Sequence, residues 1–425
     1  MNNRKLDEFT VKGGGSIDPR KFKNEIFELF SIPAFDKGTP EIVDGASVGS
    51  AKKVIEPNDI LLSKIVPHIR RCWVVPQAKA YRQIASGEWI QFRSAELVPE
   101  YVRHFLISDP FHSQFMKTVT GVGGSLLRAR PSEVEKIKIP LPSPDDQIRI
   151  AHVLSKVEGL IAQRKHHLQQ LDNLLKSVFL DMFGDPVRNE KGWNVDKFQR
   201  IILGLRNGLS PSKSGKNRSY VYTLSAITGE AFKEIYKEDT FSNVSGKYFP
   251  SKNDFLICRG NGNINLVGRA YFYPGNKGNI MFPDTIIGVT IESNAINKKF
   301  LESLWKTYFI RCQIEKEART ANGTYKINQG VINGINIILP PDELQNKFGK
   351  IVDKIESMKF HYQQSLTELE NLYGALSQKA FKGELDLSRV PLLLELPKED
   401  TESMEEMNGE THEKREMEEA CVRFK

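Results

Sequence analysis

Val134-Glu-Lys-Ile-Lys-Ile-Pro-Leu-Pro142, followed by Gln147, is the stretch that decides the fold, because the chain contains it twice. The second copy reads Ile332-Asn-Gly-Ile-Asn-Ile-Ile-Leu-Pro340 and is followed by Gln345. The differences 332 − 134 and 345 − 147 both equal 198, so the two copies are in register. Self-similarity at a fixed spacing indicates a repeated structural unit. The sequence therefore predicts two similar modules in one chain, related as a pseudo-twofold internal repeat.

The repeat divides the 425 residues into globular and helical segments. Each globular segment is long enough to bury its own core, and each is followed by a long helical pattern. We expect an α+β fold with two globular domains joined by two long antiparallel coiled-coil helices. The expected segments are a first domain (1–142), a first helix (143–184), a second domain (185–340), a second helix (341–385) and an acidic tail (386–425).

Matching elements are expected inside the two domains. Residues 59–66 have the pattern of a buried strand and residues 101–119 that of a helix with one apolar face. Residues 253–258 and 300–318 repeat these two patterns in the second domain. The glycines of residues 121–125 predict a loop after the first of these helices.

Each of the two long helical patterns carries an apolar seam with heptad spacing, which is typical of a coiled coil. The nearest partner for each seam is the other copy, and an antiparallel pair would place the two domains at opposite ends. A coiled coil between two molecules is the alternative. The residues expected to pair the helices are Leu154, Val157, Ile161, Leu168, Leu171, Leu175 and Val178 in the first, and Val352, Ile355, Tyr362, Leu366, Leu369, Tyr373 and Leu376 in the second.

The charge distribution indicates a polyanionic partner. The formal net charge is +7, but residues 397–425 hold ten acidic and five basic side chains, which leaves +12 on the remainder. A basic body favours nucleic acid. The Glu-rich tail is expected to be disordered, because it has no periodic apolar pattern.

Targeting and redox signals are few. No run of eighteen apolar residues exists that could span a membrane, and the first residues lack the apolar stretch of a signal peptide. The four cysteines are far apart and form no CxxC pair. Neither a zinc site nor a disulfide framework is therefore expected, and a reducing cytoplasm is the simplest location.

Catalytic motifs are missing from the sequence. Residues 210–217 lack both the leading glycine and the hydroxyl of a nucleotide-binding Walker loop. No glycine signature for S-adenosylmethionine, no Asn-Pro-Pro-Tyr-type tetrapeptide and no HExxH zinc motif occurs. We expect a non-catalytic protein without metal or cofactor. A nuclease site that includes Asp284 is the weakest alternative, and a coiled-coil scaffold that binds protein but not DNA is the main rival.

The doubled order of domain, proline-rich edge and long helix resembles the specificity subunit of type I restriction–modification systems. The first copy of the edge with Gln147, the second with Gln345, and the strand pattern Asn58-Asp-Ile-Leu-Leu-Ser-Lys64 carry this resemblance, which covers roughly residues 1–388. The ends of the two helical patterns, 174–183 and 372–385, also match.

The resemblance implies two target-recognition domains that each read one half of a split double-stranded DNA site. It also implies two spacer helices that fix the gap between the halves and hold two methyltransferase subunits. Motor–endonuclease subunits can join such a complex. S-adenosylmethionine, ATP and Mg²⁺ would then belong to partner subunits only.

Candidate DNA contacts are basic and amide side chains in polar loops, because these groups reach base edges and phosphates. In the first domain they are Lys64, His68, Arg70, Arg71, Arg128 and Arg130. In the second domain they are Arg206, Lys213, Lys216, Arg218, Arg259, Asn261, Asn263 and Lys326.

Overall fold

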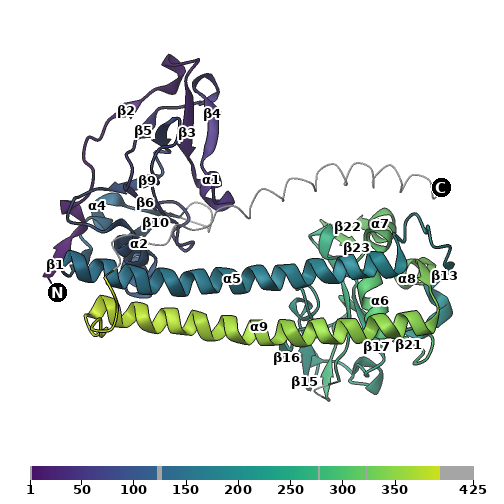
Figure 1. Ribbon diagram of the computed structural model, residues 1–425. Helices are drawn as coiled ribbons and strands as arrows, with labels where there is room; N and C mark the ends of the chain where they lie inside the picture. Colours follow the sequence, from purple (N-terminus) through teal and green to yellow (C-terminus); the bar gives the residue numbers. More distant parts are fainter. Residues whose placement is uncertain (1, 122–126, 276–277, 322, 393–425) are drawn as a thin grey trace. The chain divides into compact units, whose positions relative to one another are not determined.

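The computed structural model describes residues 2–121, 127–275, 278–321 and 323–392 (Figure 1). Within these residues, the chain forms two compact units. The first contains residues 2–167 and 362–392, and the second contains residues 168–361. Both long helices, α5 (Pro144–Phe183) and α9 (Asp342–Lys382), contribute residues to both units. Most of the predicted acidic tail lies outside the described residues, and so does most of the loop at 121–125.

Over its described residues, the first unit combines two sheets, two strand pairs and four short α-helices. Its three-stranded sheet has the order β7 (Cys72–Val74), β6 (Ile60–Ser63), β9 (Trp89–Phe92). Its five-stranded sheet has the order β2 (Ser16–Ile17), β5 (Lys52–Val54), β8 (Arg82–Ala85), β3 (Ile26–Phe30), β4 (Glu41–Asp44). The strand pairs are β1 (Asn2–Lys5) with β12 (Lys138–Leu141) and β10 (Val119–Thr120) with β11 (Arg128–Ala129). The short helices are α1 (Ile32–Lys37), α2 (Pro99–Ile107), α3 (Asp109–Phe115) and α4 (Pro131–Val134).

The second unit has related elements. Its four-stranded sheet has the order β14 (Ile202–Asn207), β21 (Ile286–Ile291), β17 (Asp254–Cys258), β19 (Ala270–Phe272). Two three-stranded sheets have the orders β16 (Tyr236–Phe241), β15 (Asn217–Tyr222), β20 (Ile280–Met281) and β18 (Gly260–Asn261), β23 (Thr324–Lys326), β22 (Arg319–Ala321). β13 (Asn194–Lys197) pairs with β24 (Asn336–Leu339). The short helices are α6 (Lys298–Trp305), α7 (Tyr308–Glu317) and α8 (Gln329–Gly334).

The two units share a common scaffold. The order β7-β6-β9 in the first matches β19-β17-β21 in the second. In each unit, an early strand pairs antiparallel with the strand that directly precedes a long helix, β1 with β12 and β13 with β24. The repeat seen in the sequence is therefore a repeat of strand topology, in a fold that mixes helices and sheets.

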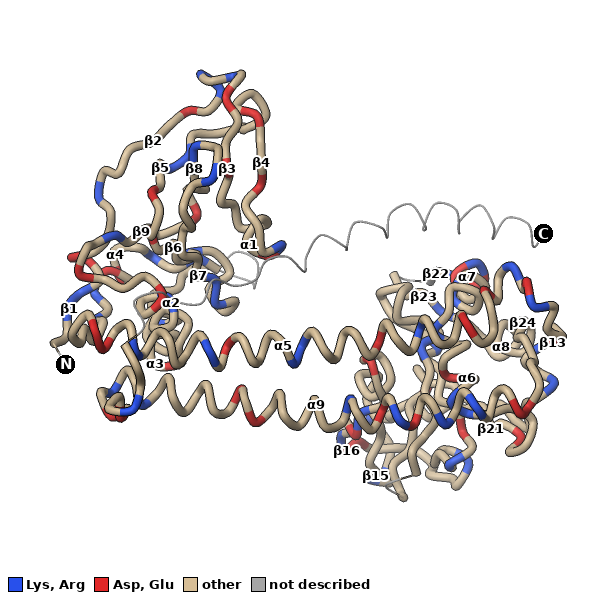
Figure 2. The backbone as a smooth tube through the Cα atoms, viewed as in Figure 1, with Lys and Arg blue, Asp and Glu red and all other residues tan. Residues whose placement is uncertain are grey.

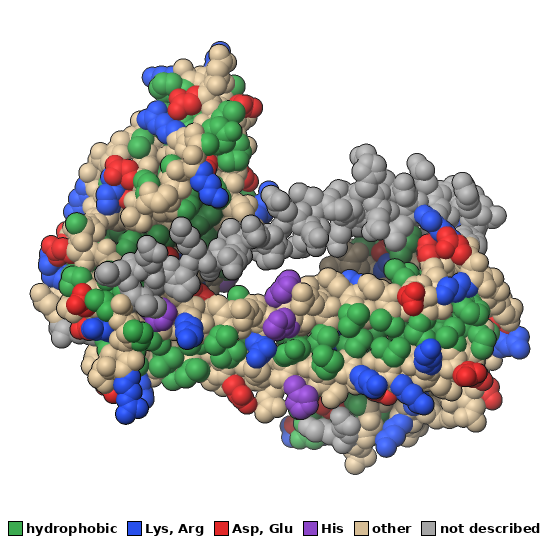
Figure 3. Space-filling model, viewed as in Figure 1, with side chains coloured by type: hydrophobic (Ala, Val, Ile, Leu, Met, Phe, Trp, Pro, Cys, Tyr) green, Lys and Arg blue, Asp and Glu red, His purple; other side chains and the backbone are tan. Residues whose placement is uncertain are grey.

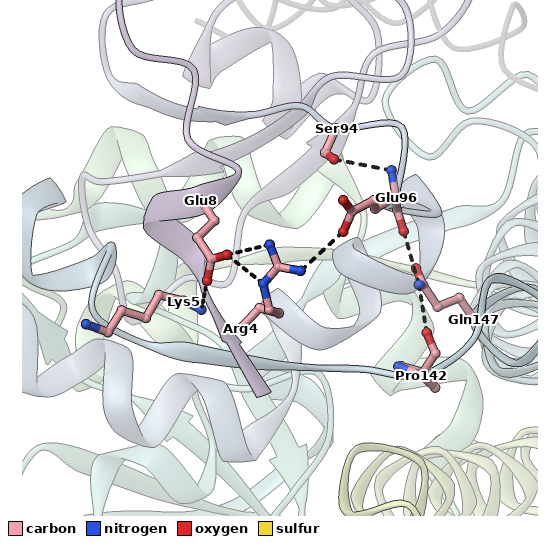
Figure 4. A network of polar contacts seen from close by, with 7 residues as sticks. All are labelled: Arg4, Lys5, Glu8, Ser94, Glu96, Pro142 and Gln147. Atoms are coloured by element: carbon pink, nitrogen blue, oxygen red, sulfur yellow. Dashed lines mark hydrogen bonds and ion pairs between the residues drawn. The ribbon is translucent and has the colours of Figure 1, made fainter. Parts of the chain in front are cut away.

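A buried glutamine fastens the start of each long helix to its unit. The Val98 N–H donates to Gln147 Oε1 at 2.9 Å. Gln147 Nε2 donates to the carbonyls of Glu96 and Pro142 at 3.2 Å each (Figure 4). In the second unit, the Asn297 N–H donates to Gln345 Oε1 at 2.9 Å, and Gln345 Nε2 donates to the Pro340 carbonyl at 2.8 Å. The amide satisfies backbone groups that would otherwise be buried without partners. This explains why glutamine occupies the same place in both copies.

The long helices pair along their seams inside each unit. In the first unit, the Arg164 guanidinium lies 5.2 Å from the centre of the Tyr362 ring and donates to Ser365 Oγ at 3.1 Å. In the second unit, Lys359 Nζ donates to Asp172 Oδ1 at 2.5 Å, and the rings of Phe179 and Phe348 lie 5.7 Å apart. From Asp172 to Phe179 along α5, the contacts on α9 move back from Lys359 to Phe348. The two helices are therefore antiparallel in the second unit.

All the residues expected to pair the helices are at least partly buried. Those classed as buried are Leu154, Val157, Leu171, Val352, Ile355 and Leu366, and those partly buried are Ile161, Leu168, Leu175, Val178, Tyr362, Leu369, Tyr373 and Leu376. The ends of the seams also pack into the globular cores. Leu154, Tyr373 and Leu376 belong to the core of the first unit, and Leu175, Val178 and Val352 to that of the second.

Two expected helices are each divided in two, and the prediction of single helices was wrong. The segment 101–119 breaks at Ser108, whose hydroxyl caps α3, and Pro110 follows in the first turn of α3. A proline there has no N–H to continue the preceding helix. The segment 300–318 breaks at Thr307, which has an extended backbone. The strand expected at 59–66 is shorter and covers only Ile60–Ser63. Val66, with a φ of 47°, could not have continued an extended strand.

His104 links the first unit's globular part to both long helices. Its Nδ1 lies 2.8 Å from the Tyr373 hydroxyl on α9, and its Nε2 lies 2.9 Å from Ser155 Oγ on α5. The side chain is fully buried. Burial, together with the charge of Arg103, holds the pKa of the His104 imidazole well below its ordinary value. The imidazole is therefore neutral in the folded protein at neutral pH.

We expect His104 to make the stability of the first unit depend on pH. Below about pH 6.5 the histidine of the unfolded chain takes up a proton that the folded chain does not bind, so the free energy of unfolding falls on acidification, by at most about 1.4 kcal/mol per pH unit from this group. His104→Gln should remove this part of the slope. Urea titrations at pH 7.5, 6.5 and 5.5 measure it, and equal slopes for both proteins would contradict the assignment.

Candidate nucleic-acid interface

Lys64 stands where the central strand of the first unit's scaffold ends. Its backbone N–H donates to the Glu88 carbonyl at 3.0 Å, and its carbonyl accepts from the Ala129 N–H at 2.8 Å. These two bonds join the end of β6 to the residue just before β9 and to the β10–β11 hairpin. The following residue, Ile65, forms an isolated bridge with Arg128.

Arg259 occupies the equivalent place in the second unit. Its backbone N–H donates to the Thr285 carbonyl at 2.8 Å, and its carbonyl accepts from the Ile327 N–H at 2.9 Å. The following residue, Gly260, pairs with Lys326 of the β22–β23 hairpin. Lys64 thus corresponds to Arg259, and Arg128 corresponds to Lys326, which lies 198 positions later. The same two places carry basic side chains in both units.

The pair in the first unit belongs to a larger basic cluster. Lys64 Nζ donates to the Gly87 carbonyl at 2.7 Å, and the carboxylate of Glu88 lies 3.9 Å from Lys64 and 3.2 Å from Arg128. Burial and then the charge of Lys64 lower the pKa of the neighbouring Lys53 ammonium. Two cations share one carboxylate, and a third cation is close enough to Lys64 for their charges to repel, so this place carries a positive excess that suits an anion.

Lys53 is a residue that the sequence reasoning missed. It lies in β5, beside Lys52, and β5 and β8 both carry basic residues in Figure 2. The signal available in the sequence was the Lys52–Lys53 doublet, but the proximity of Lys53 to Lys64 depends on the fold.

The other candidates in the first unit differ in exposure. His68 and Arg130 are exposed. Arg70 donates to the Ile107 carbonyl at 3.0 Å and pairs with Asp109 at 2.6 Å, although its side chain is 38% exposed. Its guanidinium therefore reaches the surface but already has partners within the unit.

Arg71 does not lie in an exposed loop, and that expectation was wrong. The residue is 8% exposed, and its guanidinium donates to both oxygens of Asp36 at 2.7 and 2.8 Å. The backbone explains this position, because the Ser63 N–H donates to the Arg71 carbonyl at 3.0 Å and so continues the sheet as far as Arg71. A two-point ion pair of this kind supports the fold.

The remaining candidates in the second unit are mostly exposed. Lys213, Lys216, Arg218, Asn263 and Lys326 are exposed, and Arg259 and Asn261 are partly buried. Arg259 donates to the Asp284 carbonyl at 3.3 Å. The side-chain oxygens of Asn261 and Asn263 accept from backbone N–H groups two residues later, at 2.9 and 3.0 Å, and so shape the turn after β18.

The part of the chain that the structure describes has neither a metal-binding cluster nor a membrane-spanning helix. No group of three or more His, Cys, Asp or Glu side chains there could hold a metal ion. Nor does that part contain a helix long and apolar enough to cross a membrane.

Comparison with known proteins gives relatives of one kind. No protein-family model matches the chain. It is 26% identical to the type I restriction enzyme StySPI specificity subunit of Salmonella potsdam. The 306 aligned residues are 68% of this chain and 65% of that protein. It is 22% identical to the EcoKI specificity subunit of Escherichia coli strain K12, and the 305 aligned residues are 67% of this chain and 65% of that protein. The MjaIX specificity subunit of Methanocaldococcus jannaschii is 24% identical over 320 residues, covering 68% of this chain and 69% of that protein.

Solved structures agree on the fold. A chain from a study of complex assembly and conformational transition of the type I R-M system has a TM-score of 0.55 at 19% identity. The superposition covers 90% of this chain and 98% of that chain. The S subunit of a type I restriction–modification system from M. genitalium has a TM-score of 0.52 at 15% identity, covering 89% and 96%.

The chain is a homologue of the type I restriction enzyme specificity subunits. It spans just under two thirds of the length of the first two relatives, 65% in each case.

In this specificity-subunit homologue, Arg206 has a structural place and does not lie in a phosphate-facing loop as expected. It lies in β14 and donates to both oxygens of the fully buried Asp254 at 3.0 and 2.5 Å. Burial raises the pKa of the Asp254 carboxyl, but hydrogen bonds from Arg206, Ser251 and Thr290 lower it by more, so that the pKa lies below its usual value. Asp254 is therefore a buried anion that depends on Arg206.

We expect Arg206→Ala to destabilise the second unit by about 3–5 kcal/mol, because it leaves the buried carboxylate of Asp254 without its cation. The exposed Lys213→Ala is the control and should change stability by less than about 0.5 kcal/mol. Urea denaturation followed by circular dichroism measures both. Equal stability of the two variants would mean that Arg206 is free to serve another purpose.

Proposed function

We propose that this chain is the DNA-recognition subunit of a type I restriction–modification complex, in which each globular block reads one half of a bipartite double-stranded DNA site. The observation that carries the proposal is the recurrence of the basic pairs Lys64/Arg128 and Arg259/Lys326 at equivalent places on two equivalent scaffolds. Two similar basic sites in one chain suit two similar stretches of polyanion. The homology to specificity subunits supports the same conclusion.

The two long helices are proposed to act as the spacer between the half-sites. Each helix runs without a break through residues of both units. Such a helix has a fixed rise of about 1.5 Å per residue. In this proposal, the paired helices join two target-recognition domains and keep the distance between them constant, which fixes the number of unread base pairs.

The outward faces of the long helices are proposed to dock two methyltransferase subunits, with motor–endonuclease subunits joining the assembly. Large apolar side chains that are 40–68% exposed lie on both helices, and Figure 3 shows hydrophobic side chains gathered along them. An exposed apolar patch on a helix pair is a common sign of a protein partner. The side chains concerned are Leu160, Leu174, Leu180, Met358, Phe360 and Leu372.

The chemistry is proposed to reside on the partner subunits. S-adenosylmethionine, ATP and Mg²⁺ would bind there, and this chain would contribute sequence recognition without catalysis. The location that follows is the cytoplasm, where cellular and invading DNA are accessible. The rival reading, a coiled-coil scaffold that binds only protein, is not favoured by any of the relatives.

Binding to random-sequence duplex DNA at several salt concentrations tests the proposal. The assembled complex should bind less tightly as salt rises, because phosphate contacts release counterions. Lys64→Ala with Arg128→Ala, and separately Arg259→Ala with Lys326→Ala, should each reduce the slope of log K against log salt by about two, roughly one per cation removed.

Lys354→Ala, on an exposed position of α9, is the matched control and should leave the slope unchanged. Fluorescence anisotropy measures all four proteins. An unmodified complex that binds no DNA would support the scaffold reading, whereas unchanged slopes in both double variants would show that the repeated basic pairs do not face phosphate.

A further inference from the structure

The parts that differ between the two units are where different DNA sequences would be distinguished. The strand order β7-β6-β9 recurs as β19-β17-β21, and the basic pairs stand on this common scaffold. The sheet β16-β15-β20 of the second unit recurs as β4-β3-β8 in the first, with one antiparallel and one parallel strand pair in each. The side chains on the equivalent ribbons differ, because β15 and β16 carry one arginine and three tyrosines, whereas β3 and β4 carry neither residue type. Side chains shared by the two units suit DNA-backbone contacts, which carry no sequence information directly, and side chains that differ between the units suit base contacts.

β15 and β16 form a two-stranded antiparallel ribbon along six residue pairs, from Asn217 with Phe241 to Tyr222 with Tyr236. Because side chains alternate along a strand, Arg218, Tyr220 and Tyr222 share one face of β15. Tyr222 is buried in a core cluster and anchors one end of this face. Tyr220 is 51% exposed and Arg218 is exposed, so the face projects from the core toward the other end.

The partner strand adds an aromatic and an acidic group to the same face. Glu238 lies directly across from Tyr220, and Tyr236 lies across from Tyr222. The rings of Tyr220 and Tyr236 are 5.6 Å apart and meet edge to face at 79°. Within the described residues, the side chain of Arg218 has neither an ion-pair nor a hydrogen-bond partner. The exposed face therefore presents one cation, one carboxylate and two phenol rings.

We infer that this ribbon face, made by Arg218, Tyr220, Tyr236 and Glu238, enters the major groove and reads bases of one half-site. The inference rests on the proposed function and names the residues that confer specificity in the second unit. The major groove admits a two-stranded β-ribbon, and its edges offer a partner to each group on the face. Arginine bonds guanine O6 and N7, glutamate accepts from cytosine N4, and an aromatic ring contacts the thymine methyl group.

Glu238 decides between base edges and phosphates. A carboxylate is repelled by the DNA backbone, so a face that only held phosphates would be weakened by it. At a base edge the same carboxylate is a specific acceptor. Lys213 and Lys216, exposed in the segment before β15, are placed to hold the flanking backbone.

Selection from a library of random-sequence duplexes tests the inference. The full chain, assembled with its partner subunits, is incubated with the library, and the bound duplexes are sequenced to give a two-part motif. Tyr220→Ala, Arg218→Ala and Glu238→Ala should each erase base preference at one or two positions of the same half-motif and leave the other half intact. Affinity for the selected site should fall about 5- to 150-fold in each case.

Leu203→Ala is the matched control, because Leu203 is 67% exposed but lies in β14, in a different sheet. It should leave both half-motifs unchanged. An unmodified complex that selects no motif would overturn the proposed function together with the inference. A clear motif that survives all three ribbon substitutions would overturn the inference alone. If Glu238→Ala tightens binding to every sequence while the motif persists, the face lies on phosphates and the inference is also overturned.

Discussion

A long helix with a single apolar seam cannot remain exposed in water, and the rest of this structure depends on how that seam is buried. Helices in folded proteins gain most of their stability from tertiary packing of one apolar face. Here α5 and α9 cover each other's seams inside each unit, and the seam ends continue into the globular cores through Leu154 in the first unit and Leu175 in the second. Gln147 and Gln345 then fix the point at which each helix leaves its strand pair. Each globular part and its helix segments therefore share one hydrophobic core.

Each unit buries one aspartate and neutralises it with an arginine, but the arginine comes from a different element in each unit. Asp59 and Asp254 both follow a turn that donates a backbone N–H to the carboxylate, from Glu56 at 2.7 Å and from Ser251 at 2.6 Å. Both carboxylates are fully buried, so each needs a cation. Arg93, just beyond the end of β9, is this cation in the first unit, and Arg206 in β14 is the cation in the second. The scaffold has kept the buried anion, while the strands around it have diverged.

The sequence was sufficient for the features that repeat. Equal spacing located both proline-rich edges, both glutamines and both long helices, because a heptad pattern and a fixed offset are visible without the fold. Positions within loops could not be predicted in this way. Arg71 and Arg206 look like loop cations in the sequence, but burial and carboxylate partners far along the chain make them structural. Lys53 approaches Lys64, and Tyr220 approaches Tyr236, only through strand pairing that no local pattern encodes.

The central claim, that paired helices hold two DNA-reading blocks at a set spacing, is tested most directly by lengthening both helices. Four residues inserted after Lys165 in α5 and four after Gln363 in α9 add close to one full turn to each helix and lengthen the pair by about 6 Å. That length corresponds to roughly one to two base pairs. Sequencing the methylated sites in cells that carry the altered chain with its partner subunits should show both half-sites unchanged and the unread spacer longer by one or two base pairs. An unchanged spacer with intact methylation would contradict the account.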